Sequence, residues 1–238
     1  MDNWKPRTRA VHGGTRRSQY GEVSEAIFLT QGFVYDSAEA AEARFIKAGD
    51  DEFIYARYGN PTVAMFEERM AALEGTETAL ATGSGMAAIS ATLLTLLSAG
   101  DHLLVQDCLY GGTYDYARRE FGRHGLTCDF VAGDRPDTWA DVLRPETRMI
   151  YVESITNPLV QVADLEGVVD FARAHELISV IDNTFASPVN FRPSEIGFDL
   201  SLHSGTKYLN GHSDIVCGAV IGQADVVARV KKMMNYLG

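Results

Sequence analysis

One stretch decides the fold: residues 78–97 read TALATGSGMAAISATLLTLL. Thr78–Ala81 predicts a short strand, the glycines around Ser84 predict a tight turn, and Met86–Leu97 predicts a helix. A strand that enters a helix through a glycine turn is the repeating unit of α/β proteins. We therefore expect a sheet with helices packed on its faces.

Strands and helices alternate outward from this unit. Further strands are predicted at His102–Gln106, Thr127–Val131, Met149–Glu153, Ile178–Ile181, Leu200–His203 and Ile215–Ile221. Helices are predicted between the earlier strands at Tyr114–His124, Thr138–Leu143 and Leu165–His175. This order predicts an α/β fold with a mostly parallel seven-stranded sheet flanked by helices. Ligands of such sheets bind at the carboxyl ends of the strands.

The N-terminal quarter of the chain has a different pattern. Residues 1–60 show little periodicity and many Gly, Arg, Tyr and Phe residues, so we expect an extended arm with a short helix near Ser37–Lys47. Pro61 then suits a first helical position, and helical spacing continues to Gly75. We assign residues 1–60 to the arm and residues 61–238 to the α/β domain.

The composition limits the class of partner. Among 238 residues, 46% are hydrophobic, and 32 acidic against 21 basic residues give a formal net charge of -11. This charge repels phosphate backbones and anionic lipids, so neither nucleic acid nor a membrane is expected as a partner. Cys108, Cys128 and Cys217 lack the spacing of a metal site or a disulfide framework, and no segment reaches roughly 18 apolar residues. We expect a cytoplasmic protein without a metal.

Gly83–Ala88, at the start of the predicted helix, is the first candidate binding motif. Its glycines let backbone amides approach a phosphate, and the helix dipole favours the anion. The residue pattern also fits the fingerprint of a dinucleotide-binding turn, and Asp107 lies near the position expected for an acidic residue that binds a ribose. Taken alone, this motif is compatible with a nicotinamide or flavin enzyme and with a tight turn that binds nothing.

Residues further along the chain separate these alternatives. Asp182 ends a predicted strand and could hold a ligand nitrogen protonated, although the position also suits a helix cap or turn. Lys207 is the only residue of full formal charge in residues 200–212, and such a lysine can act as an amine nucleophile and base. Ser204 and Thr206 offer hydroxyls to a phosphate. A phosphate turn, a ring-nitrogen carboxylate and a Schiff-base lysine together indicate a pyridoxal phosphate site, whereas a nicotinamide enzyme has no use for the last two.

The chain resembles the Cys/Met-metabolism family of pyridoxal-phosphate-dependent enzymes, which act on sulfur-containing amino acids. This family includes cystathionine γ-synthase, cystathionine γ-lyase, methionine γ-lyase and the homoserine-ester sulfhydrylases. The resemblance runs from the arm to the last residue and rests on five motifs in the family's order: Tyr55–Thr62, Ser84–Met86, Tyr110–Thr113, Asp182–Phe185 and Ser204–Tyr208.

The resemblance implies catalytic roles for three residues. Lys207 would bond pyridoxal 5'-phosphate and carry protons, Asp182 would contact the ring nitrogen, and Tyr110 would stack on the ring and take part in proton transfer. The resemblance also implies contacts to the phosphate, from the backbone amides of Gly85 and Met86 and from the hydroxyls of Ser204 and Thr206. Asn157 would contact the ring hydroxyl.

The same resemblance implies a role for the arm in contacts between subunits. Tyr55 and Arg57 would reach the phosphate of a neighbouring subunit, so a homo-oligomer, either a dimer or a tetramer, with sites shared between subunits is implied. Family members also continue into a smaller C-terminal domain that carries an arginine for the substrate carboxylate. The chain stops at Gly238. We therefore expect that domain to be absent, either because the chain is a fragment or because another chain supplies it.

Differences from the family pattern bear on structure and reaction. Ile155 stands where the family commonly has proline, and Gly205 stands where alanine or cysteine is usual. Neither side chain carries chemistry, so only the local stiffness of the backbone is in doubt. Gly112 stands where methionine γ-lyases carry cysteine, and residues 207–214 resemble cystathionine γ-synthase and γ-lyase. The resemblance favours γ-elimination or γ-replacement of cystathionine or O-acylhomoserine in transsulfuration, with an O-acylhomoserine sulfhydrylase or methionine γ-lyase as alternatives. A truncated cofactor-binding oligomerisation scaffold is the alternative outside the enzymes.

Overall fold

Seven strands form one sheet in residues 4–49 and 51–237, the part of the chain that the computed structural model describes. They are β1 (Thr78–Thr82), β2 (His102–Gln106), β3 (Thr127–Val131), β4 (Thr147–Glu153), β5 (Ile178–Asp182), β6 (Leu200–Ser204) and β7 (Gly218–Gly222). The spatial order is β1-β7-β6-β5-β4-β2-β3. Strand β7 runs antiparallel to both of its neighbours, while the other pairs are parallel. The predicted α/β fold with a mostly parallel sheet is confirmed.

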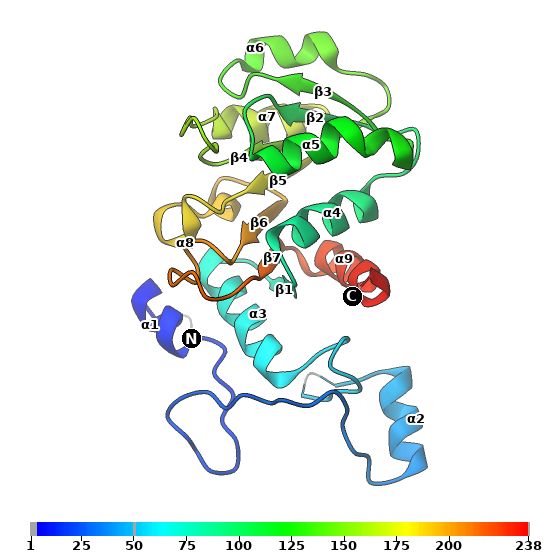
Figure 1. Cartoon of the computed structure of the whole chain (residues 1–238), viewed down its shortest axis with the longest axis vertical. Helices are drawn as coiled ribbons and strands as arrows, with labels where there is room; N and C mark the ends of the chain where they lie inside the picture. The colour runs from blue at the N-terminus through cyan, green and yellow to red at the C-terminus, as the bar shows by residue number, and fades with distance from the viewer. Residues whose placement is uncertain (1–3, 50, 238) are drawn as a thin grey trace.

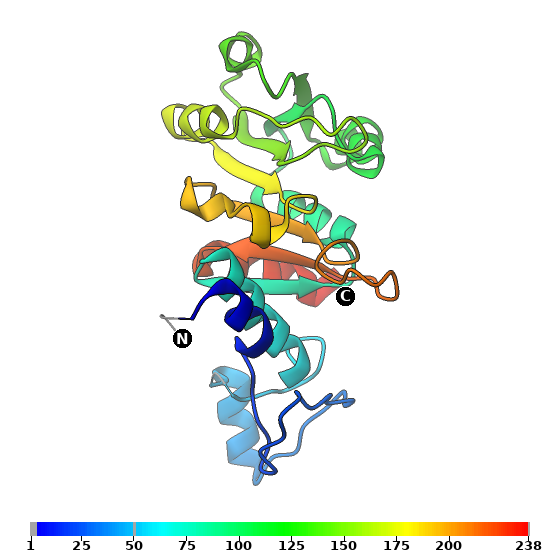
Figure 2. The same ribbon diagram turned by 90° about the vertical axis from the view of Figure 1, so that its left-hand side faces the viewer.

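Helices cover both faces of the sheet (Figures 1 and 2). One face packs against α4 (Gly85–Leu96), α5 (Gly111–Arg119) and α9 (Ala224–Leu237). The opposite face packs against α3 (Pro61–Glu74), α6 (Pro136–Trp139) and α7 (Leu165–Ala174), and α8 (Ser187–Asn190) contacts α3. Short 3-10 turns are η1 (Phe121–His124), η2 (Ala140–Val142) and η3 (Pro193–Glu195). Within the described ranges, no helix has the length and apolar character needed to cross a membrane.

The central strands are apolar because both of their faces are buried. In β4, Met149 and Tyr151 belong to the core beneath α4 and α5, and Ile150 and Val152 belong to the core beneath α6 and α7. Successive side chains of a strand point to opposite faces, so a strand covered on both sides requires apolar residues at consecutive positions. With both faces closed, the strand ends are where polar side chains can meet a ligand.

The predicted boundaries needed correction at several places. The strand predicted at Ile215–Ile221 begins only at Gly218, because the backbone N–H of Cys217 bonds to Thr206 Oγ1 and not to a neighbouring strand. The helix predicted at Tyr114–His124 is α5 followed by η1, and the helix predicted at Thr138–Leu143 is α6 followed by η2. Helix α9 was missed, although its buried residues Val227, Val230 and Met234 have helical spacing.

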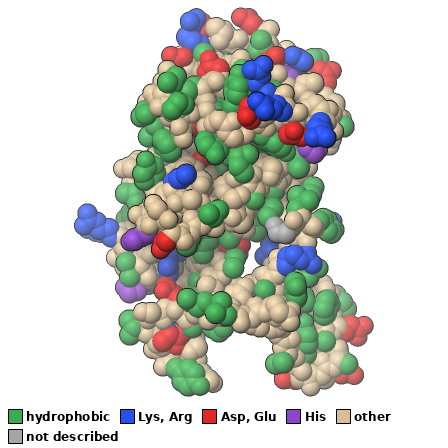
Figure 3. All heavy atoms as spheres, viewed as in Figure 1, with side chains coloured by type: hydrophobic (Ala, Val, Ile, Leu, Met, Phe, Trp, Pro, Cys, Tyr) green, Lys and Arg blue, Asp and Glu red, His purple; other side chains and the backbone are tan. Residues whose placement is uncertain are grey.

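The N-terminal arm extends away from the sheet in both ribbon views (Figures 1 and 2). Its predicted helix is α2 (Ala38–Ile46), capped by Ser37, and a second helix, α1 (Pro6–His12), was not predicted. Hydrophobic side chains lie on the surface of the arm (Figure 3). The most exposed of them are Tyr20, Val23, Leu29, Val34 and Ile46. The predicted limits at Met1 and Gly238 fall outside the described residues.

A buried contact between a carboxyl group and a histidine fastens α3 to the middle of the sheet. Glu74, the last residue of α3, lies 2.6 Å from His203 Nε2 in β6, and both side chains are fully buried. The same Glu74 Oε1 accepts hydrogen bonds at 3.3 Å from Asn183, which follows β5, and from Ser201 in β6. Glu74 therefore ties one helix to two adjacent strands at the point where those strands approach their carboxyl ends.

We predict that Glu74→Ala lowers the free energy of unfolding by about 3–5 kcal/mol, because it leaves a buried imidazole without its carboxylate. Urea denaturation followed by circular dichroism measures the change. Asp170→Ala, which removes an exposed ion pair with Arg173, is the control and should have a much smaller effect. Equal losses in the two variants would contradict a special role for the buried pair.

Candidate active site

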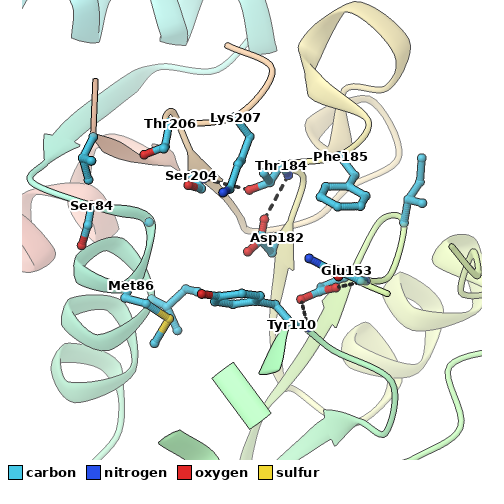
Figure 4. A pocket seen from close by; sticks show the side chains of 15 residues that line it. Ser84, Met86, Tyr110, Glu153, Asp182, Thr184, Phe185, Ser204, Thr206 and Lys207 are labelled. Carbon is cyan, nitrogen blue, oxygen red and sulfur yellow. Dashed lines mark hydrogen bonds between the residues drawn. The ribbon is translucent and has the colours of Figure 1, made fainter. Parts of the chain in front are cut away.

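A cavity of about 220 Å³ lies at the carboxyl ends of β4, β5 and β6. Its walls come from the β1–α4 turn, the start of α5, and the segments that follow the three strands. The predicted site residues that line it are Gly85, Met86, Tyr110, Asn157, Asp182, Ser204, Thr206 and Lys207. Residues far apart in the sequence thus meet in one space, as Figure 4 shows.

The β1–α4 turn forms one wall of the cavity. Ser84 caps α4 by accepting a hydrogen bond from the backbone N–H of Ala87, which leaves the N–H groups of the first turn directed outward. A Cβ atom on Gly85 would lie 2.7 Å from Ser204 Cβ, so only glycine allows the helix start to approach β6 this closely. The turn and Ser204 together form a site suited to an anion.

Asp182 lies between the ends of the other strands, at the carboxyl end of β5. Its Oδ1 accepts a hydrogen bond of 3.0 Å from the backbone N–H of Thr184. Loss of solvent raises the pKa of Asp182 above its usual value, while Thr184 and the nearby His203 act in the opposite direction. A cation placed in the cavity would favour the charged form of this carboxylate.

Lys207 follows β6 in a tight turn at the mouth of the cavity. The backbone N–H of Lys207 bonds to Ser204 O at 3.2 Å, and that of Ser204 bonds to Thr184 Oγ1 at 2.8 Å. These bonds place Lys207 close to the end of β6. The Lys207 side chain is exposed in this chain, whereas its neighbours Ser204 and Thr206 are half-buried. An exposed amine at a cavity mouth is accessible to a carbonyl group.

Glu153 is a site residue that the sequence analysis missed. It ends β4 opposite Asp182 and lines the cavity, and its side chain is only 4% exposed. Burial, together with the charge of Asp182, raises the pKa of Glu153 to about 7. The signal was present in the sequence, because a carboxylate at the end of a predicted buried strand is unusual. Thr184 and Phe185 also line the cavity.

Tyr55 and Arg57 do not line this cavity within their own chain. The Arg57 guanidinium donates a hydrogen bond to the backbone oxygen of Asn235 in α9, and it lies 4.6 Å from the centroid of the Tyr58 ring. Tyr55 lies beside it, with a ring that is 41% exposed. The structure therefore brings these two residues together with α9, away from Lys207 and Asp182.

The glycine at position 205 has a structural explanation. A Cβ atom on Gly205 would lie 2.5 Å from Cys217 Sγ, so the cysteine sulfur occupies the space that a side chain at position 205 would need. Cys217 also bonds through its backbone to both the N–H and the hydroxyl of Thr206. The difference from the family pattern is thus compensated by a neighbouring residue that supports the same turn.

The fold and the cavity define an α/β protein in which a glycine turn at a helix start, a carboxylate and a lysine surround one cavity. The chain belongs to the family of Cys/Met metabolism PLP-dependent enzymes, whose model matches residues 7–238. It is 39% identical over 226 residues to the L-methionine gamma-lyase of Porphyromonas gingivalis, an alignment that covers 94% of this chain and 56% of that protein. The chain thus spans little more than half the length of this relative.

Solved structures agree with the family assignment. Cystathionine gamma-lyase from Lactobacillus plantarum matches with a TM-score of 0.89 and 34% identity over 98% of this chain and 59% of that chain. A putative O-acetylhomoserine (thiol)-lyase from Campylobacter jejuni matches with a TM-score of 0.89 and 30% identity, over 95% of this chain and 56% of that chain. That second structure contains N'-pyridoxyl-lysine-5'-monophosphate.

The residues around the cavity fit pyridoxal phosphate, the cofactor of this family. The approach of Gly85 to Ser204 leaves backbone amides and a hydroxyl on one side, where a phosphate would be bound. A carboxylate and an accessible amine lie at the ends of the two adjacent strands, where a ring nitrogen and an aldehyde carbon would need them. The donor set therefore matches both ends of the cofactor.

We predict that Gly205→Ala destabilises the protein by about 1–3 kcal/mol through overpacking against the Cys217 sulfur, and that a further Cys217→Ala change recovers part of this loss. A double-mutant cycle of unfolding free energies measures the coupling. Cys217→Ala alone is the control for the lost sulfur contacts. Strictly additive effects of the two substitutions would contradict the proposed contact.

Proposed function

We propose that this chain is the cofactor-binding part of an enzyme that processes sulfur-containing amino acids, with pyridoxal phosphate carried on Lys207. The observation that supports this most strongly is the convergence of Lys207, Asp182 and the Gly85 turn on one cavity. Each lies at a strand end or helix start, and each has a distinct task in binding this cofactor. Residues 61–238 would form the cofactor-binding domain.

The roles follow from the chemistry of the side chains. When bound, pyridoxal phosphate supplies an electron sink for bonds at the amino acid's α-carbon. The first-turn amides of α4 and the hydroxyls of Ser204 and Thr206 would hold the phosphate. Asp182, as an anion, would keep the ring nitrogen protonated. The Lys207 amine, once displaced by the substrate amine, would move protons from Cα toward Cβ so that the γ-substituent can leave.

Two further residues would orient the ring. Tyr110, whose side chain faces the same space as Asp182 and Lys207 in Figure 4, would stack on it and assist proton transfer. Asn157 would contact the ring hydroxyl from the segment that follows β4. Both belong to loops and not to strands, so their positions depend on how those loops are held.

For the reaction, we favour γ-elimination or γ-replacement with cystathionine or O-acylhomoserine. Gly112 supports this choice, because a Cβ atom there would lie 2.5 Å from Cε1 of Tyr110. A cysteine at this position, as in methionine γ-lyases, would force the Tyr110 ring to move. Methionine γ-elimination and O-acylhomoserine sulfhydrylation are the alternatives, and a relative named for the first is 39% identical to this chain.

We further propose a cytoplasmic homo-oligomer in which the arm, residues 1–60, completes a neighbour's site. The free cysteines Cys108, Cys128 and Cys217 support a reducing compartment. The exposed apolar side chains of the arm support an oligomer, because such residues are usually covered in a stable assembly. Tyr55 and Arg57 would then contact the phosphate at the partner's site.

We predict that borohydride treatment of the protein with bound pyridoxal phosphate places a stable pyridoxyl label on Lys207, because the reagent reduces an imine to a secondary amine. Peptide mapping by mass spectrometry locates the label. Lys207→Ala should remain unlabelled, and Lys231→Ala should be labelled like the unchanged protein. A label on any other lysine would remove Lys207 from its proposed role.

A substrate panel tests the proposed reaction. With pyridoxal phosphate added, we expect oxoacid formation from L-cystathionine to exceed that from L-methionine by about tenfold, a difference of roughly 1.4 kcal/mol in activation free energy. O-acylhomoserine with a thiol tests the replacement reaction in the same preparation. Methionine as the best substrate would overturn the preferred reaction. A chain that is labelled on Lys207 yet turns over none of these substrates would support the scaffold alternative.

The arm is tested by mixing two variants that are each impaired in binding pyridoxal phosphate. Arg57→Ala should weaken pyridoxal phosphate retention, because it removes a guanidinium from the partner's phosphate, and Lys207→Ala should abolish the imine. A hybrid dimer of the two variants contains one site with both natural residues, so mixing should restore up to about half of the sites in each hybrid. Absorbance of the bound imine measures the recovery. No recovery despite hybrid formation would show that Arg57 does not complete a neighbour's site.

A further inference from the structure

We propose that Glu153 is a positioning residue that holds Tyr110 and Asn157 in the arrangement that binds pyridoxal phosphate. The inference rests on the proposed function, since it assigns a task to a residue of the same cavity. Glu153 is placed there by geometry: it ends β4, lines the cavity and is almost fully buried.

The Glu153 carboxylate uses a different oxygen for each of two loops. Oε1 accepts a hydrogen bond of 2.7 Å from the backbone N–H of Tyr110, and Oε2 accepts one of 3.0 Å from the backbone N–H of Asn157. Figure 4 shows these bonds as dashed lines beside the Tyr110 ring. One side chain therefore bridges the loop before α5 and the loop after β4.

The backbone of Glu153 extends this connection to the sheet. Its N–H donates a hydrogen bond of 2.9 Å to the side-chain oxygen of Gln106, the last residue of β2. Strands β2 and β4 are adjacent and parallel, so the bond joins their carboxyl ends. Tyr110 is thus held relative to the sheet and not only by its own loop.

A carboxylate is required at this position because both groups that it binds are donors. A glutamine has one acceptor oxygen and one NH₂ donor, so it would satisfy one backbone N–H and oppose the other. Burial and the nearby Asp182 disfavour the charge on this carboxylate. The two charge-assisted hydrogen bonds offset part of that cost.

The test compares Glu153→Gln with the matched variant Glu67→Gln. Glu67 is also a carboxylate whose pKa is raised by burial, but it accepts one backbone N–H, from Ala81, and lies outside this cavity. We expect Glu153→Gln to raise the dissociation constant of pyridoxal phosphate about tenfold or more. We also expect it to reduce the visible circular dichroism of the bound cofactor, because the Tyr110 ring is no longer fixed. Glu67→Gln should match the unchanged protein in both measurements.

Amide hydrogen exchange on the cofactor-free protein provides a second, independent measurement. Exchange at Tyr110 or Asn157 should accelerate at least about tenfold in Glu153→Gln and stay unchanged in Glu67→Gln. If Glu153→Gln has the same exchange rates and the same dissociation constant as the protein without the substitution, the inference is wrong. Failure of the proposed function would be seen differently, because the protein without any substitution would then bind no pyridoxal phosphate.

Discussion

The buried pair of Glu74 and His203 is the interaction on which the site depends most. His203 immediately precedes Ser204, and Asn183, which also bonds to Glu74, immediately follows Asp182. Glu74 thus contacts the residues next to Ser204 and Asp182, at the ends of β6 and β5, which carry the proposed phosphate and ring-nitrogen contacts. Because buried polar groups need their hydrogen-bond partners, this contact fixes one relative position of α3, β5 and β6.

Inside the cavity, two acidic residues lie close to each other. Glu153 and Asp182 stand opposite each other at the ends of adjacent parallel strands, and burial raises the pKa of both. Two carboxylates with little solvent between them repel each other. A cationic ring nitrogen near Asp182 would relieve this repulsion, while the backbone N–H groups on Glu153 stabilise its charge. The electrostatics of the cavity therefore suit a ligand that has a cation on this side and an anion near α4.

The arm differs from the domain in both structure and surface. It contains two short helices without buried side chains and exposes several apolar residues, whereas the domain has cores on both faces of its sheet. Arg57 contacts α9 of its own chain, at a distance from the cavity in sequence and in space. A segment with this surface gains stability mainly by packing on something else, which is the physical basis for proposing that it contacts a neighbouring subunit.

The sequence alone determined the strand order along the chain, the sheet type and part of the cavity lining, including Gly85, Asp182 and Lys207. The strand predictions succeeded because local signals carry them: consecutive apolar residues mark buried strands, and glycines mark the turns at their ends. Tyr110 and Asn157 were predicted only through the resemblance to the family. The roles of Glu74, Glu153 and Cys217 could be recognised only in the tertiary structure. Each acts through a contact with a residue at least 12 positions away: Glu74 with His203, Glu153 with Tyr110, and Cys217 with Gly205. Local sequence patterns do not show which distant groups will meet.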